Sequence, residues 1–204
     1  MSLKKIYLVR HGQTDLNLQG IVQGSGVDSP LNETGRWQAD KFFQAYKDVP
    51  FDKIYTSALQ RSVQSVQQFI DLGIPHERHA GLNEISWGVR EGTLITPEED
   101  AYYYETLDRW KNGEVEYPIE GGESPAQVAA RQRPVVDLIL SRPEEQTILI
   151  CMHGRAMRIL LTQLLNYPLQ EMDRFEHHNL CLYLLHHTGT MFNVERYCDV
   201  DHLA

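Results

Sequence analysis

Two short apolar runs, each ending in a histidine followed by a glycine, constrain the fold of this chain more than any other feature. Ile6–Val9 leads into Arg10-His11-Gly12, and Thr147–Met152 leads into His153-Gly154. Runs of this length and composition are typical of buried strands in a parallel sheet. In an open α/β sheet, ligands bind just outside the carboxyl ends of the strands. The sequence therefore predicts that two imidazoles, 142 residues apart, face one another at one strand edge. With an adjacent arginine they favour an anion, with phosphate as the leading candidate.

Strand-like and helix-like segments alternate along the rest of the chain, which predicts an α/β architecture. The expected strands cover residues 4–9, 51–55, 75–80 and 146–152, with a terminal hairpin of 180–186 and 190–197. The expected helices cover 33–47, a stretch that begins at Ser57 and continues through Ile70, 124–140, and 155–165. Glycines and a proline make residues 20–30 a loop.

Three polar residues mark the expected helix starts. Asn32 is a candidate cap for the helix that begins at residue 33. Ser57–Gln60 and Ser124–Gln127 both match the capping-box pattern, in which the first and fourth side chains satisfy free backbone amides. Pro134 lies inside the second of these helices and removes one backbone hydrogen bond, so a kink or break is expected there.

Residues 85–123 differ in composition from their surroundings. Beyond Arg90 they contain ten acidic and two basic residues. The segment is predicted to be a partly helical lid inserted into a single domain of residues 1–204, a length that suits one domain. Its tyrosines are expected to pack rather than to form a recognition surface.

The charge of the chain restricts its partners. The formal net charge is −9, which argues against nucleic acid or an anionic membrane as the main partner. A small phosphorylated metabolite stays compatible, because a few focused arginines create a local positive site on an acidic protein. The expected oligomeric state is a monomer or a homodimer.

The three cysteines, Cys151, Cys181 and Cys198, show no CxxC spacing. An odd number without that spacing indicates neither a disulfide framework nor a zinc cluster. Cys151 lies in an apolar run and is expected to be a small core residue. No signal-peptide pattern is present, and no apolar stretch approaches the ~18 residues that span a bilayer, so a cytoplasmic location is expected.

Several histidines occur in pairs that suggest a metal site. They are His76 with His79, the doublet His177-His178 and the doublet His186-His187. Nothing in their spacing supplies a matched third ligand, so no metal is expected. His177 and His178 are instead expected to reach the rim of the anion pocket.

Phosphoryl transfer without a metal requires a nucleophile, positive donors for the phosphate oxygens, and an acid for the departing oxygen. His11 is the candidate nucleophile, because a histidine can form a phosphoramidate that water later cleaves. Arg10, Arg61 and His153 are the candidate donors. His153 begins a predicted helix, whose free amides favour an anion. Glu84 follows a predicted strand and is the candidate general acid.

Six ordered blocks of residues resemble the histidine phosphatase superfamily, in its phosphoglycerate-mutase-like branch, which includes cofactor-dependent phosphoglycerate mutases and α-ribazole phosphatases. The match extends from residue 4 to about 160. The blocks are Leu8–Thr14, which fits LxRHGxT; Asn17 with Gln23-Gly24 and Asp28–Leu31; Ser57–Arg61; Leu82–Glu84 with Trp87-Gly88 and Glu91-Gly92; Gly121–Ser124; and His153-Gly154.

The resemblance implies a three-layer α/β/α sandwich around a mostly parallel sheet, and phosphorylation of His11. It implies that Arg10, Arg61 and His153 hold the phosphate. It places Asn17, Gln23, Gly24 and Gly154 nearby. Glu84 would act as acid and then as base toward water, without metal or cofactor. Ser62 and Ser65 depart from the residues usual at their positions, with an expected effect on packing rather than chemistry.

The resemblance leaves three functions open. A metal-independent phosphatase of a small phosphomonoester is favoured. A phosphoglycerate mutase, which returns the phosphoryl group to its substrate, is the second candidate. An acidic lid disfavours it, because holding a polyanion beneath negative charge costs electrostatic energy. A catalytically inactive phosphate-binding module is the third.

Overall fold

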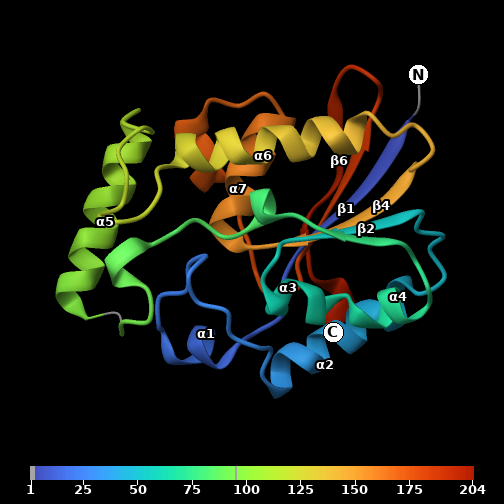
Figure 1. Ribbon diagram of the computed structural model, residues 1–204, viewed down its shortest axis with the longest axis horizontal. Coiled ribbons are helices and arrows are strands. Elements are labelled where there is room, and N and C mark those ends of the chain that lie inside the picture. Colours follow the sequence, from blue (N-terminus) through green and yellow to red (C-terminus); the bar gives the residue numbers. More distant parts are fainter. Residues whose placement is uncertain (1–2, 95) are drawn as a thin grey trace.

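The computed structural model describes residues 3–94 and 96–204, without the side chains of residues 97–100. The described chain forms a six-stranded sheet in the order β3-β2-β4-β1-β5-β6 (Figure 1). The strands are β1 (Lys4–Arg10), β2 (Lys53–Thr56), β3 (His76–Arg78), β4 (Thr147–Met152), β5 (Leu182–His187) and β6 (Phe192–Asp199). Strand β5 runs antiparallel to its neighbours β1 and β6, and the other pairings are parallel. The predicted mostly parallel sheet is therefore confirmed.

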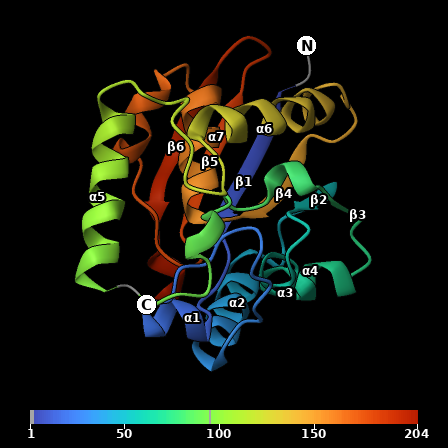
Figure 2. The ribbon, with the colours of Figure 1, turned by 60° about the vertical axis from the view of Figure 1, so that its left-hand side comes forward.

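Helices cover both faces of this sheet (Figures 1 and 2). The α-helices are α1 (Asp15–Gln19), α2 (Glu33–Tyr46), α3 (Gln60–Ser65), α4 (Gln67–Asp71), α5 (Pro97–Lys111), α6 (Pro125–Leu140) and α7 (Gly154–Leu164). Four short 3₁₀ helices of the described chain are η1 (Ala80–Leu82), η2 (Gly88–Arg90), η3 (Leu169–Arg174) and η4 (Asp201–Leu203). The five-residue helix α1 has no counterpart among the predicted elements.

Side chains of β1 alternate between two apolar cores. Ile6 and Leu8 pack into the core shared with α6 and α7. Tyr7 and Val9 pack into the core on the opposite face, shared with α2 and α4. Because successive strand residues point to opposite faces, a run buried on both sides is apolar throughout. This burial explains the uninterrupted apolar pattern and confirms the three-layer α/β/α sandwich.

Two of the three predicted helix starts are confirmed. The Asn32 side chain accepts a hydrogen bond from the Gly35 amide, and Ser124 with Gln127 forms the reciprocal capping box of α6. The capping box at Ser57 is wrong. Helix α3 begins at Gln60 without a side-chain cap, because the Ser57 hydroxyl is bonded to other groups described below. The expected continuous helix also divides at Val66, whose φ of −124° leaves the helical region.

Of the kink or break predicted at Pro134, the break does not occur. Helix α6 runs unbroken from Pro125 to Leu140 with Pro134 inside it. Pro134 and Ala130 are both exposed. At exposed positions water can reach the carbonyl that lacks its helical partner, which explains why the helix tolerates the proline.

The acidic segment 85–123 is partly helical, as predicted, and it carries η2 and α5. Trp110 of α5 is fully buried and donates from its indole nitrogen to the Tyr117 carbonyl at 2.8 Å. Tyr103 packs against Trp87 with ring centroids 5.4 Å apart, which confirms packing for that tyrosine. Tyr104, in contrast, is exposed. The segment is thus anchored to the core of α6 and α7 through its aromatic side chains.

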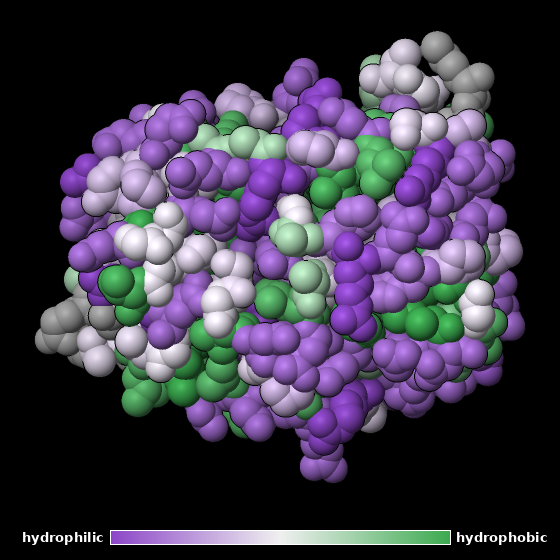
Figure 3. Space-filling model, viewed as in Figure 1, coloured by the Kyte–Doolittle hydropathy of each residue, from purple (hydrophilic) through white to green (hydrophobic). Residues whose placement is uncertain are grey.

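The face of the molecule in Figure 3 is mainly hydrophilic, with smaller apolar groups between the polar side chains. Among the described helices, none has the length and apolar character needed to cross a bilayer.

Candidate active site

The register of β1 and β4 brings the two histidines together. Arg10 lies opposite Met152 in this parallel pair, and the His11 amide donates to the Met152 carbonyl at 3.0 Å. His11 and His153 therefore leave the sheet side by side, and their ring centroids lie 5.0 Å apart. Both side chains are almost completely buried. The structure places the two imidazoles at one strand edge, as the sequence pattern predicts.

The guanidinium groups of Arg10 and Arg61 complete this cluster and affect the pKa values of both histidines. Burial lowers the pKa of His11 well below its usual value, and the charges of Arg61 and Arg10 lower it further. The pKa of His153 is lowered in the same way, first by burial and then by Arg61. Both imidazoles are therefore neutral at neutral pH. The positive charges of Arg10 and Arg61 repel one another, and the negative charge of Glu84 compensates them in part.

Three buried nitrogens in this cluster have no hydrogen-bond partner among the described residues. They are Nε of Arg10, Nε of Arg61 and Nδ1 of His153. Buried polar atoms without a partner are rare, because desolvation without a compensating bond is costly. An anion between these groups would satisfy donors and neutralise repelling charges at the same time.

Hydrogen bonding fixes the tautomer of His11. Its Nδ1 lies 2.7 Å from the Gly12 carbonyl oxygen, which can only accept. Nδ1 therefore carries the proton, and Nε2 carries the lone pair. A neutral imidazole with Nε2 free is the form that can attack phosphorus.

Ser57 is the hydrogen-bond partner of His153, whereas the sequence predicts that Ser57 caps a helix. The Ser57 hydroxyl lies 2.7 Å from His153 Nε2 and accepts from the Leu59 amide. It also contacts the Ser62 hydroxyl at 2.7 Å. Ser62 has the Leu59 carbonyl as an acceptor at 2.8 Å. Either hydroxyl can donate in the contact of Ser57 with Ser62, so Ser57 can act as donor or as acceptor toward Nε2 of His153.

One sequence signal identifies Ser57. It directly follows β2, and its amide donates to the Cys151 carbonyl of β4 at 3.2 Å. The strand-end argument that singles out the histidines applies equally to this serine. Ser62 and Ser65 also do more than pack, because the Ser65 hydroxyl accepts from the Gly12 amide at 2.9 Å.

Arg61 is held by the loop of residues 20–30. Its terminal nitrogens donate to the Val27 carbonyl at 2.6 Å and to the Gly24 carbonyl at 3.2 Å. Gly24 therefore acts through its carbonyl on Arg61. The Gln23 amide group is engaged with Thr14 and Ser29.

Asn17 caps the start of α1 as part of a box with Thr14. Its side-chain oxygen lies 3.5 Å from the amide nitrogen of Asn179. Asn179 itself donates to the His11 carbonyl at 3.0 Å. Asn17 is thus linked to the cluster through Asn179, a residue that the sequence analysis did not identify.

Arg10 donates to Nδ1 of His177 at 3.1 Å, so the prediction that His177 reaches the pocket rim is confirmed. Burial and the Arg10 charge lower the pKa of His177 to about 2, which keeps this nitrogen an acceptor. The first residue of α7, Gly154, packs against the same ring. A Cβ atom at Gly154 would lie 2.8 Å from a ring carbon of His177.

Glu84 lies at the start of α7. One carboxylate oxygen accepts from the amides of Ile85 at 2.9 Å and Ala156 at 2.8 Å, and the other accepts from the Arg155 amide at 3.1 Å. The sequence assigned the free amides of this helix to a bound anion. Those of Arg155 and Ala156 instead bind the protein's own carboxylate.

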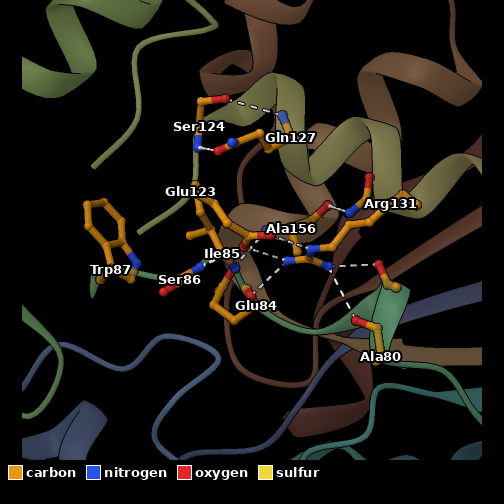
Figure 4. A network of polar contacts seen from close by, with 12 residues as sticks. Ala80, Glu84, Ile85, Ser86, Trp87, Glu123, Ser124, Gln127, Arg131 and Ala156 are labelled. Carbon is orange, nitrogen blue, oxygen red and sulfur yellow. Dashed lines mark hydrogen bonds and ion pairs between the residues drawn. The ribbon is translucent and has the colours of Figure 1, made fainter. Parts of the chain in front are cut away.

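Arg131 of α6 fixes the segment that carries Glu84 (Figure 4). It donates to the Glu84 carbonyl at 2.9 Å and to the Gly81 carbonyl at 2.8 Å. It also forms a two-point contact with the Glu123 carboxylate, at 2.7 and 3.0 Å. Glu123 in turn accepts from the Ser86 amide at 2.8 Å. One guanidinium therefore joins both ends of the acidic segment to α6.

Replacing Arg131 with methionine is expected to lower the free energy of unfolding by about 2 kcal/mol, because buried carbonyls and a half-buried carboxylate lose their donor. Thermal or urea unfolding measures this change. Arg133→Met is the matched control on the same helix, since Arg133 is exposed and pairs with Asp137. Equal stability of the two variants would contradict the structural role of Arg131.

Helices on both faces of a mostly parallel sheet, with two imidazoles and two guanidinium groups at its strand ends, define an α/β protein with a site suited to a tetrahedral anion. The chain belongs to the histidine phosphatase superfamily (branch 1), whose family model matches residues 6–200.

The names of two similar curated proteins describe different activities. A probable phosphoglycerate mutase of Erwinia tasmaniensis is 30% identical over 208 residues, which cover 98% of this chain and 94% of that protein. The human 6-phosphofructo-2-kinase/fructose-2,6-bisphosphatase 4 is 31% identical over 171 residues, which cover 83% of this chain and 34% of that protein.

Solved structures of similar fold include named phosphatases. A mycobacterial glucosyl-3-phosphoglycerate phosphatase in complex with VO₃ has a TM-score of 0.84 and 25% identity, covering 97% of this chain and all of that chain (100%). Phosphoserine phosphatase from Entamoeba histolytica, in complex with 3-phosphoglyceric acid, has a TM-score of 0.84 and 25% identity. The match covers 98% of this chain and 100% of that chain. An α-ribazole phosphatase from Shigella flexneri, at 23% identity and a TM-score of 0.83 over 96% of both chains, shares the fold.

Proposed function

We propose that this protein is a metal-independent phosphatase that hydrolyses a small phosphomonoester through a phosphohistidine on His11. The observation that carries the proposal is the buried cluster of two neutral imidazoles and two guanidinium groups, in which three nitrogens lack a partner among the described residues. Such a cluster combines a nucleophile with donors for the phosphate oxygens.

In the proposed first step, Nε2 of His11 attacks phosphorus and the bond from phosphorus to the ester oxygen breaks. Arg10, Arg61 and His153 hold the remaining phosphate oxygens as charge develops on them. Glu84 gives a proton to the departing alcohol. In the second step, water attacks the phosphohistidine, Glu84 takes the proton of that water, and inorganic phosphate leaves with His11 restored.

The acidic segment 85–123 favours hydrolysis over mutase chemistry. A mutase has to retain a phosphorylated intermediate that carries several negative charges, and the ten acidic residues of this segment disfavour this retention. The structural relatives named as phosphatases support the same choice, whereas the curated relatives named as probable phosphoglycerate mutases keep the alternative open. We expect the substrate to be a small phosphorylated metabolite, with the segment 85–123 as its lid.

A direct test compares two reactions of the purified protein. With p-nitrophenyl phosphate and EDTA, we expect turnover that persists without free divalent metal. With 3-phosphoglycerate and a trace of 2,3-bisphosphoglycerate, we expect free phosphate to appear faster than 2-phosphoglycerate. Faster formation of 2-phosphoglycerate would favour the mutase. No turnover across a broad panel of phosphate esters, by a folded protein that binds phosphate, would favour the inactive module.

A further inference from the structure

A second group of chemically active side chains lies outside the catalytic cluster. Glu176, His178 and Cys198 each present one ligand atom, and these three atoms lie within 4.8 Å of one another. Glu176 and His178 belong to the loop before β5, and Cys198 belongs to β6. The sequence analysis found no third ligand for the His177-His178 doublet. The fold supplies one from a strand twenty residues further along the chain.

The combination of donors determines which cation would bind. Carboxylate oxygen, imidazole nitrogen and thiolate sulfur are the three ligand types that zinc takes in proteins. Magnesium and calcium prefer oxygen ligands and gain little from a thiolate. We propose that Glu176, His178 and Cys198 form a binding site for a thiophilic divalent cation such as zinc. Cys181, whose buried thiol interacts with that of Cys198, is not among these three ligands.

The backbone around these ligands is held in place before any cation binds. The Tyr183 hydroxyl donates to the Glu176 carbonyl at 2.6 Å, and the Glu176 amide donates to the Tyr197 hydroxyl at 3.1 Å. The His178 carbonyl accepts from the Cys181 amide at 3.2 Å. Within the described part of the chain, neither the Glu176 carboxylate nor the His178 ring has a hydrogen-bond partner. Both side chains are exposed and can rotate toward a cation.

The proposed site is adjacent to the catalytic cluster. Between its two loop ligands lies His177, which accepts from Arg10, and next to them lies Asn179, which donates to the His11 carbonyl. Arg10, His178 and Asn179 also line one open cavity of about 450 Å³. A cation that joins this loop to β6 would therefore restrain the segment that positions Arg10, without touching the phosphate.

Equilibrium dialysis of the full chain against Zn²⁺ tests the proposal, with a phosphine reductant present so that both thiols stay free. We expect one Zn²⁺ per chain for the wild type. His178→Gln and Cys198→Ser should each weaken binding by about tenfold or more, because each removes one of three ligands. His186→Gln is the matched control, since His186 is another exposed histidine beside a carboxylate, that of Glu195. Its affinity for Zn²⁺ should be unchanged.

Two measurements on the wild type keep the test independent of how the variants fold. Co²⁺ in place of Zn²⁺ should produce sulfur-to-cobalt charge-transfer absorption in the near ultraviolet, because a thiolate is among the ligands. At a Zn²⁺ concentration 100 times Kd, the melting temperature should rise by about 5–10 °C, while Mg²⁺ should have no effect. Absence of stoichiometric Zn²⁺ binding, a cobalt spectrum without the sulfur band, or equal loss of affinity in His186→Gln would overturn the proposal.

Discussion

Replacement of His11 with alanine is expected to reduce kcat for a phosphomonoester by at least about 10⁴-fold, because the variant lacks the atom that receives the phosphoryl group. The structure explains why no neighbour substitutes for it. Nε2 of His153, the other imidazole, is bonded to Ser57. Steady-state kinetics with p-nitrophenyl phosphate measures the loss. Rapid quenching in base, which preserves phosphohistidine, should trap a phosphorylated intermediate in the wild type but not in the variant.

The matched control is His186→Ala, which removes a partly exposed histidine of β5 and should leave kcat within about twofold, as expected for a surface substitution far from the site. Circular dichroism and binding of inorganic phosphate establish that the His11 variant is folded. A folded His11→Ala variant that retains more than a tenth of wild-type activity would exclude His11 as the nucleophile.

The pH dependence of wild-type kcat/KM also tests the role of His11 as the nucleophile. Because burial, Arg61 and Arg10 lower the pKa of His11, its imidazole stays neutral in acid that protonates an ordinary histidine. The part of the kcat/KM profile that reports His11 should therefore fall only below about pH 6.5. The stability of the folded state changes with pH in the same direction as the activity. The unfolded chain takes up the proton first, so the folded state loses stability as pH decreases through that range.

The second large effect is expected for Glu84→Gln. Loss of a general acid costs about 10²- to 10⁴-fold when the leaving group is a poor one, such as an alkyl alcohol, and far less when it is p-nitrophenolate. We therefore expect kcat to fall steeply with an alkyl phosphate and by less than about tenfold with p-nitrophenyl phosphate. A series of aryl and alkyl phosphates measures this dependence.

The environment of Glu84 makes that test informative. Three backbone amides donate to its carboxylate. A glutamine offers one acceptor oxygen, so the variant also weakens the start of α7. A loss of equal size for every leaving group would mean that Glu84 stabilises this helix end and donates no proton.

Asp52→Asn provides the control for that structural cost. The Asp52 carboxylate also accepts two backbone amides, those of Gln146 and Thr147, each at 2.8 Å. It lies at the opposite ends of the strands, away from the histidines. Its variant loses the same type of contact at an exposed position, so it should lose stability while keeping its dependence on the leaving group unchanged.

The sequence predicts the central sheet well because burial on both faces leaves a plain signal. The apolar runs before His11 and His153 are long enough to identify β1 and β4, and the following His-Gly pairs identify the edge where a ligand would bind. The terminal hairpin is predicted for the same reason, from alternating residues around a polar turn.

The details that the sequence does not predict depend on the folded surroundings of a residue. Ser57 fits a capping box by spacing, but its hydroxyl meets His153, whose position depends on strand register. Pro134 breaks helices in general, yet solvent satisfies the exposed carbonyl that it leaves unpaired. The contact of Arg10 with His177 also depends on register and on a loop that spacing alone cannot place.

The pairing of β1 has a consequence for how the chain reaches this fold. Both of its neighbours, β4 and β5, come from residues 147–187, so the first strand has no partner until most of the polypeptide has been synthesised. Contacts of such large sequence separation form slowly, and an unpaired apolar strand is prone to aggregate in the meantime. The nascent chain should therefore depend on protection of Ile6–Val9, and phosphate affinity should appear only in the final stage of folding.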